Sequence, residues 1–185
     1  MSARPVHPED YYTVEGYLEL ESRSDVRHEL VGGRVYAMSG GTERHDLAAF
    51  WLARRLAGTF EPRGCAVFPH NRKLRVDDVF RYPDILVRCG RPADQHYEVD
   101  ALLVVEVPSP ESAVRDRRDK ASNYARLASL AAYVVVDPER PRIEVYAIED
   151  GRWTWRVYGP GAKLHLDGVD VDVDEMYAYL DVMTS

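Results

Sequence analysis

Two acids in the middle of the chain have the residue types and settings of a metal-dependent hydrolytic site. Asp84 follows Pro83 at the start of a β-rich run, and Glu106 ends the apolar run 101–105. They lie 22 positions apart, so neighbouring strands could set them side by side. Burying a carboxylate after five apolar residues is unfavourable unless it is paired or metal-bound. Two close carboxylates repel each other, and a hard divalent cation such as Mg²⁺ relieves that repulsion.

A lysine and a third acid could complete such a site. Asp116, Lys120 and Tyr124 recur at i, i+4 and i+8, so they form one ridge of the helix predicted after Glu106. In phosphodiester hydrolysis, an ammonium group there would position or deprotonate the attacking water and offset charge in the transition state. Glu29, in a predicted strand near the N-terminus, would be a further carboxylate on the metal side.

Each of these residues also has a structural interpretation. Asp84 is typical of a turn after proline, and Glu106 of a buried salt bridge to an arginine. Lys120 would form a surface pair with the acid one helical turn earlier, and Glu29 would face solvent. His45, near the start of a predicted helix, is typical of a helix cap or a core edge. The residues alone leave these alternatives open.

Composition bounds the class of protein. The chain has 185 residues, of which 45% are hydrophobic and 30% charged, as in one soluble globular domain with residues 1–10 as a loose arm. No apolar run approaches the ~20 residues of a membrane span, and the N-terminus has no signal-like core. Cys65 and Cys89 lack zinc-ligand spacing and are interpreted as reduced thiols, so we expect a cytoplasmic protein.

The charge balance allows only a local nucleic-acid surface. A net charge of −7 argues against non-specific coating of nucleic acid, which requires a basic surface. Two basic clusters could still line a groove and contact phosphates. Their members are Arg72, Lys73, Arg75, Arg115, Arg117 and Arg118.

The hydrophobic patterns predict an α/β (α+β) fold, with a mixed sheet flanked by a few helices. Helices are expected for about three turns from residue 13 and at 43–60, 112–129 and 173–183. Strands are expected at 65–69, 73–76, 83–87, 101–107 and 132–136, and hairpins at 27–38 and 143–158. Gly90–Glu98 is expected to be a polar loop. The aromatic pattern of the second hairpin (Tyr146, Trp153, Trp155, Tyr158) indicates sheet packing rather than base stacking.

Several segments together resemble one nuclease family. Residues 28–36, His-Glu-Leu-Val-Gly-Gly-Arg-Val-Tyr, resemble the opening of the Uma-type restriction endonuclease family, within the PD-(D/E)XK nuclease superfamily. Further motifs follow in the family's order and approximate spacing, and the match covers about residues 10–160. They are His45, Pro83-Asp84, Glu106-Val107-x-Ser109-Pro110, Asp116-x-x-x-Lys120-x-x-x-Tyr124 and Tyr133-x-x-Val136-Asp137-Pro138.

The resemblance implies a restriction-endonuclease-like core in which Asp84 and Glu106 hold Mg²⁺, or Mn²⁺ in its place. The Val107 carbonyl would be a further ligand and Glu29 an accessory acid. The superfamily lysine usually stands two residues after the glutamate, a place taken here by Pro108. As in the similar family, Lys120 on the following helix would replace it. Superfamily members that cut both strands usually need two active sites, which implies a homodimer.

We therefore expect a Mg²⁺-dependent endonuclease that hydrolyses phosphodiester bonds of DNA and does not associate with membranes. The main alternative is a non-catalytic binding or assembly module that keeps the fold and uses the acids structurally. A third hypothesis, a metal-independent hydrolase using Ser109 or Cys65, requires a histidine within reach of either.

Overall fold

The computed structural model describes residues 10–38, 40–108 and 114–185, and for 114–118 the backbone alone. Its helices are α1 (Val14–Arg23), α2 (Glu43–Phe60), α3 (Val114–Tyr124) and α4 (Val173–Met183), with a short 3₁₀ helix at Glu61–Arg63. None of the helices in these ranges is long and apolar enough to span a membrane.

Within the described residues, thirteen strands form three sheets. The strands are β1 (His28–Val31), β2 (Arg34–Ala37), β3 (Cys65–Pro69), β4 (Lys73–Val76), β5 (Val79–Arg81), β6 (Ile85–Cys89), β7 (Tyr97–Glu98), β8 (Leu103–Glu106), β9 (Ala132–Asp137), β10 (Arg142–Glu149), β11 (Arg152–Tyr158), β12 (Lys163–Leu166) and β13 (Val169–Asp172).

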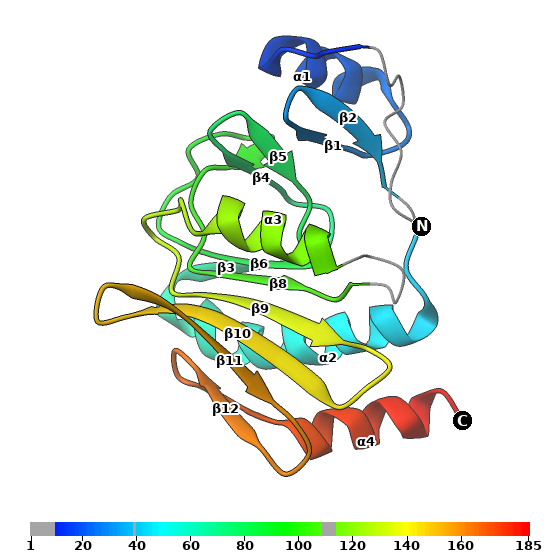
Figure 1. Cartoon of the computed structure of the whole chain (residues 1–185), viewed down its shortest axis with the longest axis vertical. Helices are drawn as coiled ribbons and strands as arrows, with labels where there is room; N and C mark the ends of the chain where they lie inside the picture. Colours follow the sequence, from blue (N-terminus) through cyan, green and yellow to red (C-terminus); the bar gives the residue numbers. More distant parts are fainter. Residues whose placement is uncertain (1–9, 39, 109–113) are drawn as a thin grey trace.

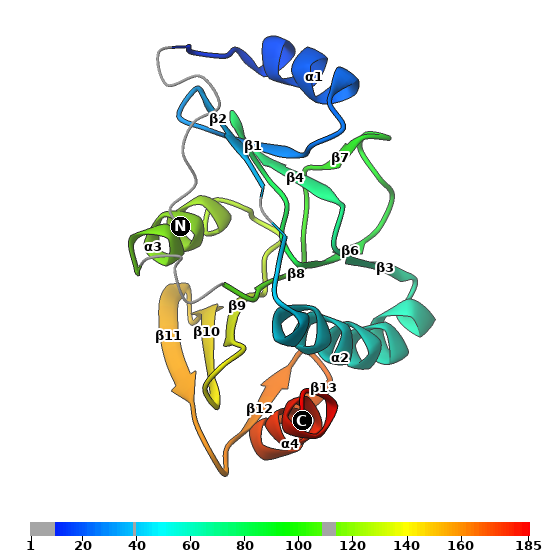
Figure 2. The same cartoon turned by 90° about the vertical axis from the view of Figure 1, so that its right-hand side faces the viewer.

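A six-stranded mixed sheet forms the centre of the fold, in the order β11-β10-β9-β8-β6-β3. Only β8 and β9 run parallel within it, among the described strands. Val105 and Val87 pack with α2 and α4 on one face, whereas Val104 and Leu86 pack with α3 on the other. Figure 2 shows these helices on opposite sides of the sheet. Strand β8 is thus buried on both faces, as its apolar run predicts.

A second sheet, in the order β2-β1-β5-β4-β7, sits above the six-stranded sheet in Figure 1 and carries α1. Tyr17 of α1 packs on Leu30 and Phe80, and its hydroxyl donates to the His28 carbonyl at 2.6 Å. The β1–β2 turn uses Gly32 and Gly33 at positive φ, as the Gly-Gly pair predicts.

Some elements differ from the sequence predictions. Helix α2 has the predicted bounds, and the Thr42 side chain caps it. The Asp77-Asp78 turn, however, leads into the additional strand β5, and the predicted polar loop contains β7. The hairpin of β12 and β13 was also missed. Strands of two to four residues carry too few alternations to be recognised without their partners.

The interpretation of both cysteines as reduced thiols is wrong in this structure. Cys65 and Cys89 form a disulfide, because the antiparallel pairing of β3 with β6 sets them opposite each other with Cα atoms 4.1 Å apart. Their sequence separation gave no sign of that pairing. A disulfide sulfur is not a nucleophile, so Cys65 does not support the metal-independent hydrolase, and Ser109 lies outside the described residues.

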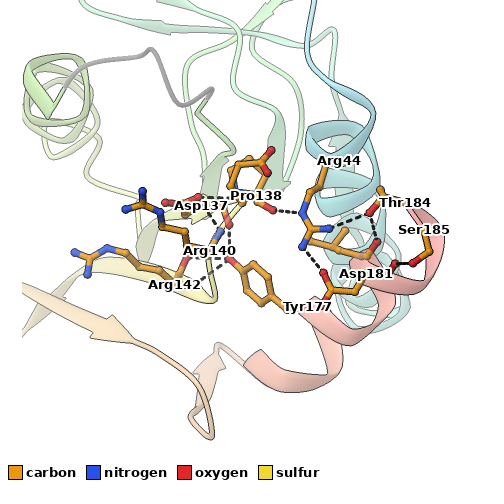
Figure 3. A network of polar contacts seen from close by, with 11 residues as sticks. Arg44, Asp137, Pro138, Arg140, Arg142, Tyr177, Asp181, Thr184 and Ser185 are labelled. Carbon is orange, nitrogen blue, oxygen red and sulfur yellow. Dashed lines mark hydrogen bonds and ion pairs between the residues drawn. The ribbon is translucent and has the colours of Figure 1, made fainter.

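A polar network fastens the N-terminal end of α2 to α4 and to the β9–β10 turn (Figure 3). Arg44 donates from Nε to the Pro138 carbonyl at 2.6 Å, and from its Nη atoms to Asp181 at 2.6 Å and Thr184 at 3.0 Å. Tyr177 of α4 donates its hydroxyl to the Asp137 carbonyl. These bonds fix the start of α2, the turn that carries His45.

Replacing Tyr177 with phenylalanine is expected to lower the free energy of unfolding by about 1–3 kcal/mol. The buried hydroxyl accepts from the Arg142 backbone N–H at 3.2 Å besides donating to Asp137, and its loss leaves turn groups without that partner. Urea denaturation measures the change. The matched variant Tyr179→Phe removes a hydroxyl from the same helix, and an equal loss in both variants would contradict this role.

Candidate active site

The register of the six-stranded sheet brings Asp84 and Glu106 together. Ile85 pairs with Val105, and the same register continued by one residue sets Asp84 opposite Glu106. The Val107 backbone N–H donates to Asp84 Oδ2 at 2.7 Å. Side chains opposite each other on an antiparallel pair share one face and lie close together. This register sets the two strand-end acids side by side at one edge of the sheet.

Both acids line one cavity of about 550 Å³. Its wall is built by the ends of β6 and β8, by α3, by the start of α2 and by the turn after β3. The titratable or charged side chains other than Tyr133 that line it are Asp25, Arg27, His45, His70, Tyr82, Asp84, Glu106 and Lys120. A small polar substrate group could thus contact side chains from four elements at once.

Glu106 is buried and pairs with the predicted helix ridge. Lys120 Nζ donates to Glu106 Oε2 and the Tyr124 hydroxyl to Oε1, each at 2.8 Å. The pKa of Glu106 is raised to about 7, because burial and repulsion from Asp84 and Glu29 outweigh the attraction of Lys120. The cation paired with Glu106 is therefore Lys120, and not an arginine as the structural interpretation of Glu106 proposed.

Asp84, in contrast, is held in its ionised form. Burial would raise its pKa, but hydrogen bonds from His45 and His70, the charge of His45 and the Val107 N–H hold that pKa well below its usual range. His45 Nε2 lies 3.1 Å from Asp84 Oδ1, and its Nδ1 lies 2.9 Å from Asp46. Burial opposes protonation of His45, yet the two aspartates raise its pKa to about 9. At neutral pH, Asp84 is an anion beside a histidine cation.

Glu29 lies close enough to act on this centre electrostatically. It accepts from Arg81 Nη1 at 2.7 Å and from the Tyr82 backbone N–H at 3.2 Å. Burial opposes ionisation of Glu29, but attraction to Lys120 and Arg81 lowers its pKa. Lys120 therefore lies in the field of two carboxylates, Glu106 and Glu29.

The donor set at this edge of the sheet is small but fits a hard cation. Among the residues that the structure describes, no three His, Cys, Asp or Glu side chains are grouped as a metal site. Asp84 and Glu106 nevertheless provide two carboxylates beside the backbone of Val107. Mg²⁺ usually takes one or two protein carboxylates and keeps several waters, so two acids and one carbonyl suffice.

Comparison with known proteins identifies the family. The family model described as "Putative restriction endonuclease" (Uma2) matches residues 14–174. The chain belongs to this family. It is 29% identical over 181 residues to the uncharacterized protein slr1290 of Synechocystis sp., covering 94% of this chain and 95% of that protein. It is 25% identical over 148 residues to the uncharacterized protein sll1609 of the same organism, covering 76% and 84%.

A solved structure agrees with the nuclease-like fold of the Uma2 family. The crystal structure titled as a putative nuclease belonging to DUF820, from Anabaena variabilis, superposes with a TM-score of 0.77. The match covers 91% of this chain and 98% of that chain at 13% sequence identity. It confirms the predicted mixed α+β architecture.

The first predicted basic cluster of this Uma2 chain has structural roles. Arg72 pairs with the buried Glu98 at 2.7 Å, and Arg75 donates to the Asp77 carbonyl at 2.7 Å. Lys73 is buried, with its ammonium over aromatic rings, and burial lowers its pKa. We therefore do not assign these three as DNA contacts. The side chains of the second cluster lie outside the described residues: Arg115, Arg117 and Arg118.

Sequence reasoning missed His70 and underestimated His45. His70 follows β3 with φ 52°, its backbone N–H donates to the Asp84 carbonyl at 2.7 Å, and its ring lies 3.7 Å from the carboxylate. From the sequence, Gly41, which precedes α2, has no role beyond marking a break between elements. A Cβ atom there would lie 2.3 Å from His45 Nδ1, so the glycine leaves room for the His45 ring.

Without metal, the protein is expected to lose stability between about pH 4.5 and pH 7 through Glu106. Its pKa is about 7 when folded and 4.5 ordinarily, so in this range the folded state binds more protons. Stability from this group is then fully present below pH 4.5 and falls as pH rises, by on the order of 3 kcal/mol. Denaturation in EDTA across this range should show the fall in wild type and its absence in Glu106→Gln. Parallel curves for the two proteins would contradict the raised pKa.

Proposed function

We propose that this Uma2 protein is a Mg²⁺-dependent endonuclease that hydrolyses phosphodiester bonds of DNA. The observation that carries the proposal is the meeting of Asp84, Glu106 and Lys120 at one cavity wall. Asp84 stays ionised at neutral pH, and Glu106, whose pKa is about 7, is partly protonated there, so that binding of a cation would displace its remaining proton. Family membership supports the nuclease class, and the finer assignment depends on these residues.

Asp84, Glu106 and the Val107 carbonyl would hold the cation. When bound, Mg²⁺, or Mn²⁺ in its place, polarises the phosphate and lowers the pKa of a water molecule. Lys120 would place its ammonium beside the phosphate and offset the negative charge that develops in the transition state. Glu29, whose pKa is lowered by Lys120 and Arg81, is an accessory acid that favours the charged form of that ammonium.

The proposal includes a homodimer. One such site cuts one strand at a time, so a protein that cuts both strands of a duplex needs two copies of it. Light scattering of the purified chain measures the oligomeric state directly, and a monomer that cuts both strands would contradict this part.

Cleavage of supercoiled plasmid by the purified chain tests the proposal. Nicking or linearisation is expected with Mg²⁺ and with Mn²⁺ and is expected to stop in EDTA. Cleavage that persists in EDTA would contradict the metal role. The absence of cleavage under all three conditions would favour the alternative below.

One observation favours a second candidate, a non-catalytic binding or assembly module. Both oxygens of Glu106 already accept hydrogen bonds, from Lys120 and Tyr124, and both oxygens of Asp84 contact His45 or the Val107 N–H. Such pairing could serve stability alone. In that case Glu106→Gln and Asp84→Asn would change the free energy of unfolding, with no cleavage to lose.

A further inference from the structure

An aromatic row leads from the candidate active site to the edge of the six-stranded sheet. Tyr133 lines the cavity, and its ring stacks on Tyr146 with centroids 5.5 Å apart. Tyr146 in turn stacks on Trp155 at 6.3 Å. The three are cross-strand neighbours on β9, β10 and β11, and β11 is the outermost strand (Figure 1). The row therefore spans two strand spacings, about 10 Å.

Exposure rises along this row. Tyr133 is 1% exposed at the cavity wall, Tyr146 is half-buried, and Trp155 is 56% exposed. The prediction that the hairpin aromatics pack into the sheet holds for Tyr158, which packs on the core. It fails for Trp155. Around this tryptophan, further large apolar side chains on the same face of the hairpin are exposed: Ile148, Trp153 and Val157. We call Tyr146, Trp155 and these three residues the hairpin ledge.

A buried carboxylate fixes the orientation of the ledge rings. Glu144 Oε2 accepts from the Tyr146 hydroxyl at 3.1 Å and from Trp155 Nε1 at 3.0 Å, and Arg142 Nε donates to Oε1 at 3.1 Å. The polar edges of both rings are thus satisfied from within, while the Trp155 ring remains open to solvent. An aromatic ring held in this way loses little conformational entropy when a ligand stacks on it.

We propose that the hairpin ledge binds unpaired bases of a DNA strand whose backbone enters the cavity. This inference rests on the proposed function, because it extends the same site. Every nucleobase has a flat π face that can stack on an exposed tryptophan, and in a duplex those faces are covered by neighbouring base pairs. Because the aromatic row begins at the cavity wall, a DNA strand bound in the cavity could extend along the row. This favours DNA over an unrelated partner as the ligand of the ledge.

Because the protein is acidic, we expect base stacking to contribute more to its affinity for a DNA strand than attraction to phosphates does. With a net charge of −7, the protein as a whole does not attract phosphates. Stacking of one base on an aromatic side chain is expected to change affinity by about 5- to 100-fold, judged by alanine substitution. Single strands should therefore bind more tightly than blunt duplexes of the same length.

Fluorescence anisotropy of a labelled twelve-nucleotide oligothymidylate tests the proposal in EDTA, where cleavage cannot interfere. Trp155→Ala is expected to weaken binding about tenfold, and Trp155→Phe should retain most of it because a phenyl ring still stacks. The matched control is Phe50→Ala, which removes a 52% exposed ring from α2 on the other face of the sheet. This control should bind as wild type does.

Three results would contradict the proposal that the hairpin ledge binds unpaired bases. They are equal binding by wild type and Trp155→Ala, no binding of the single strand by wild type, and conversion of a larger assembly to a smaller one by Trp155→Ala in light scattering. The last result would assign the face to a second copy of the chain. If the protein binds the single strand but does not cleave DNA in Mg²⁺, the proposed nuclease function is wrong and the base-binding role of the ledge stands. If it cleaves DNA but does not bind the single strand, the base-binding role is wrong and the nuclease function stands.

Discussion

Asp84→Asn is expected to lower the rate of plasmid cleavage by at least about 100-fold, while the protein stays folded. The substitution removes the carboxylate that is ionised at neutral pH and keeps a side chain of the same size. It also removes the anion that holds the proton on His45. The pKa of His45 should therefore fall from about 9 toward its ordinary value near 6.5. Cleavage kinetics measure the first effect and NMR titration of the histidine ring measures the second.

Asp46→Asn is the matched control, because Asp46 is the other carboxylate in contact with His45 and its own side chain is exposed. It should lower the pKa of His45 and leave most of the cleavage rate. A wild-type rate in Asp84→Asn would remove Asp84 from the proposed site. An equal loss in both variants would indicate that the histidine cation, and not a carboxylate ligand, is what the reaction needs.

Lys120→Ala is expected to lower the rate about 100- to 1,000-fold and to move the onset of activity to higher pH. Lys120 is the cation in contact with Glu106 and lowers the pKa of that group toward 7. Without it, that pKa rises further, so Glu106 ionises and can accept a cation only at higher pH. A pH–rate profile from pH 6 to pH 10 separates this shift from a simple loss of rate.

Two variants test whether the positive charge at position 120 causes the loss in Lys120→Ala. Lys120→Arg keeps a cation near Glu106 and should keep the wild-type onset of activity, although the guanidinium geometry differs. Lys163→Ala removes an exposed lysine paired with Asp172 and should change neither rate nor profile. An unchanged onset in Lys120→Ala would contradict the electrostatic role.

Local signals in the sequence predicted much of the fold and the two acids of the site. Thr42 before an amphipathic run predicted the start of α2, and the Gly32-Gly33 pair predicted the first hairpin. The apolar run before Glu106 predicted a strand buried on both faces. Each of these signals lies within one element, where propensity, capping and periodicity act over a few residues.

Contacts between distant segments could not be predicted in the same way. The side-chain partners of Asp84 come from α2 and from the turn after β3, and the two cysteines meet only through the register of β3 and β6. From the sequence, Arg72 is a candidate phosphate contact, but in the fold it pairs with the buried Glu98. Which acid pairs with which cation depends on the order of the strands in the sheet, and the spacing of residues along the sequence does not reveal that order.

Calorimetric titration of the metal-free protein with Mn²⁺ at pH 8 tests the central claim most directly. At that pH, Glu106, with a pKa of about 7, is mostly ionised even before metal binds. We expect saturable binding by wild type and none by the double variant Asp84→Asn/Glu106→Gln. Binding of equal affinity in both proteins would contradict the claim that these two acids hold the cation.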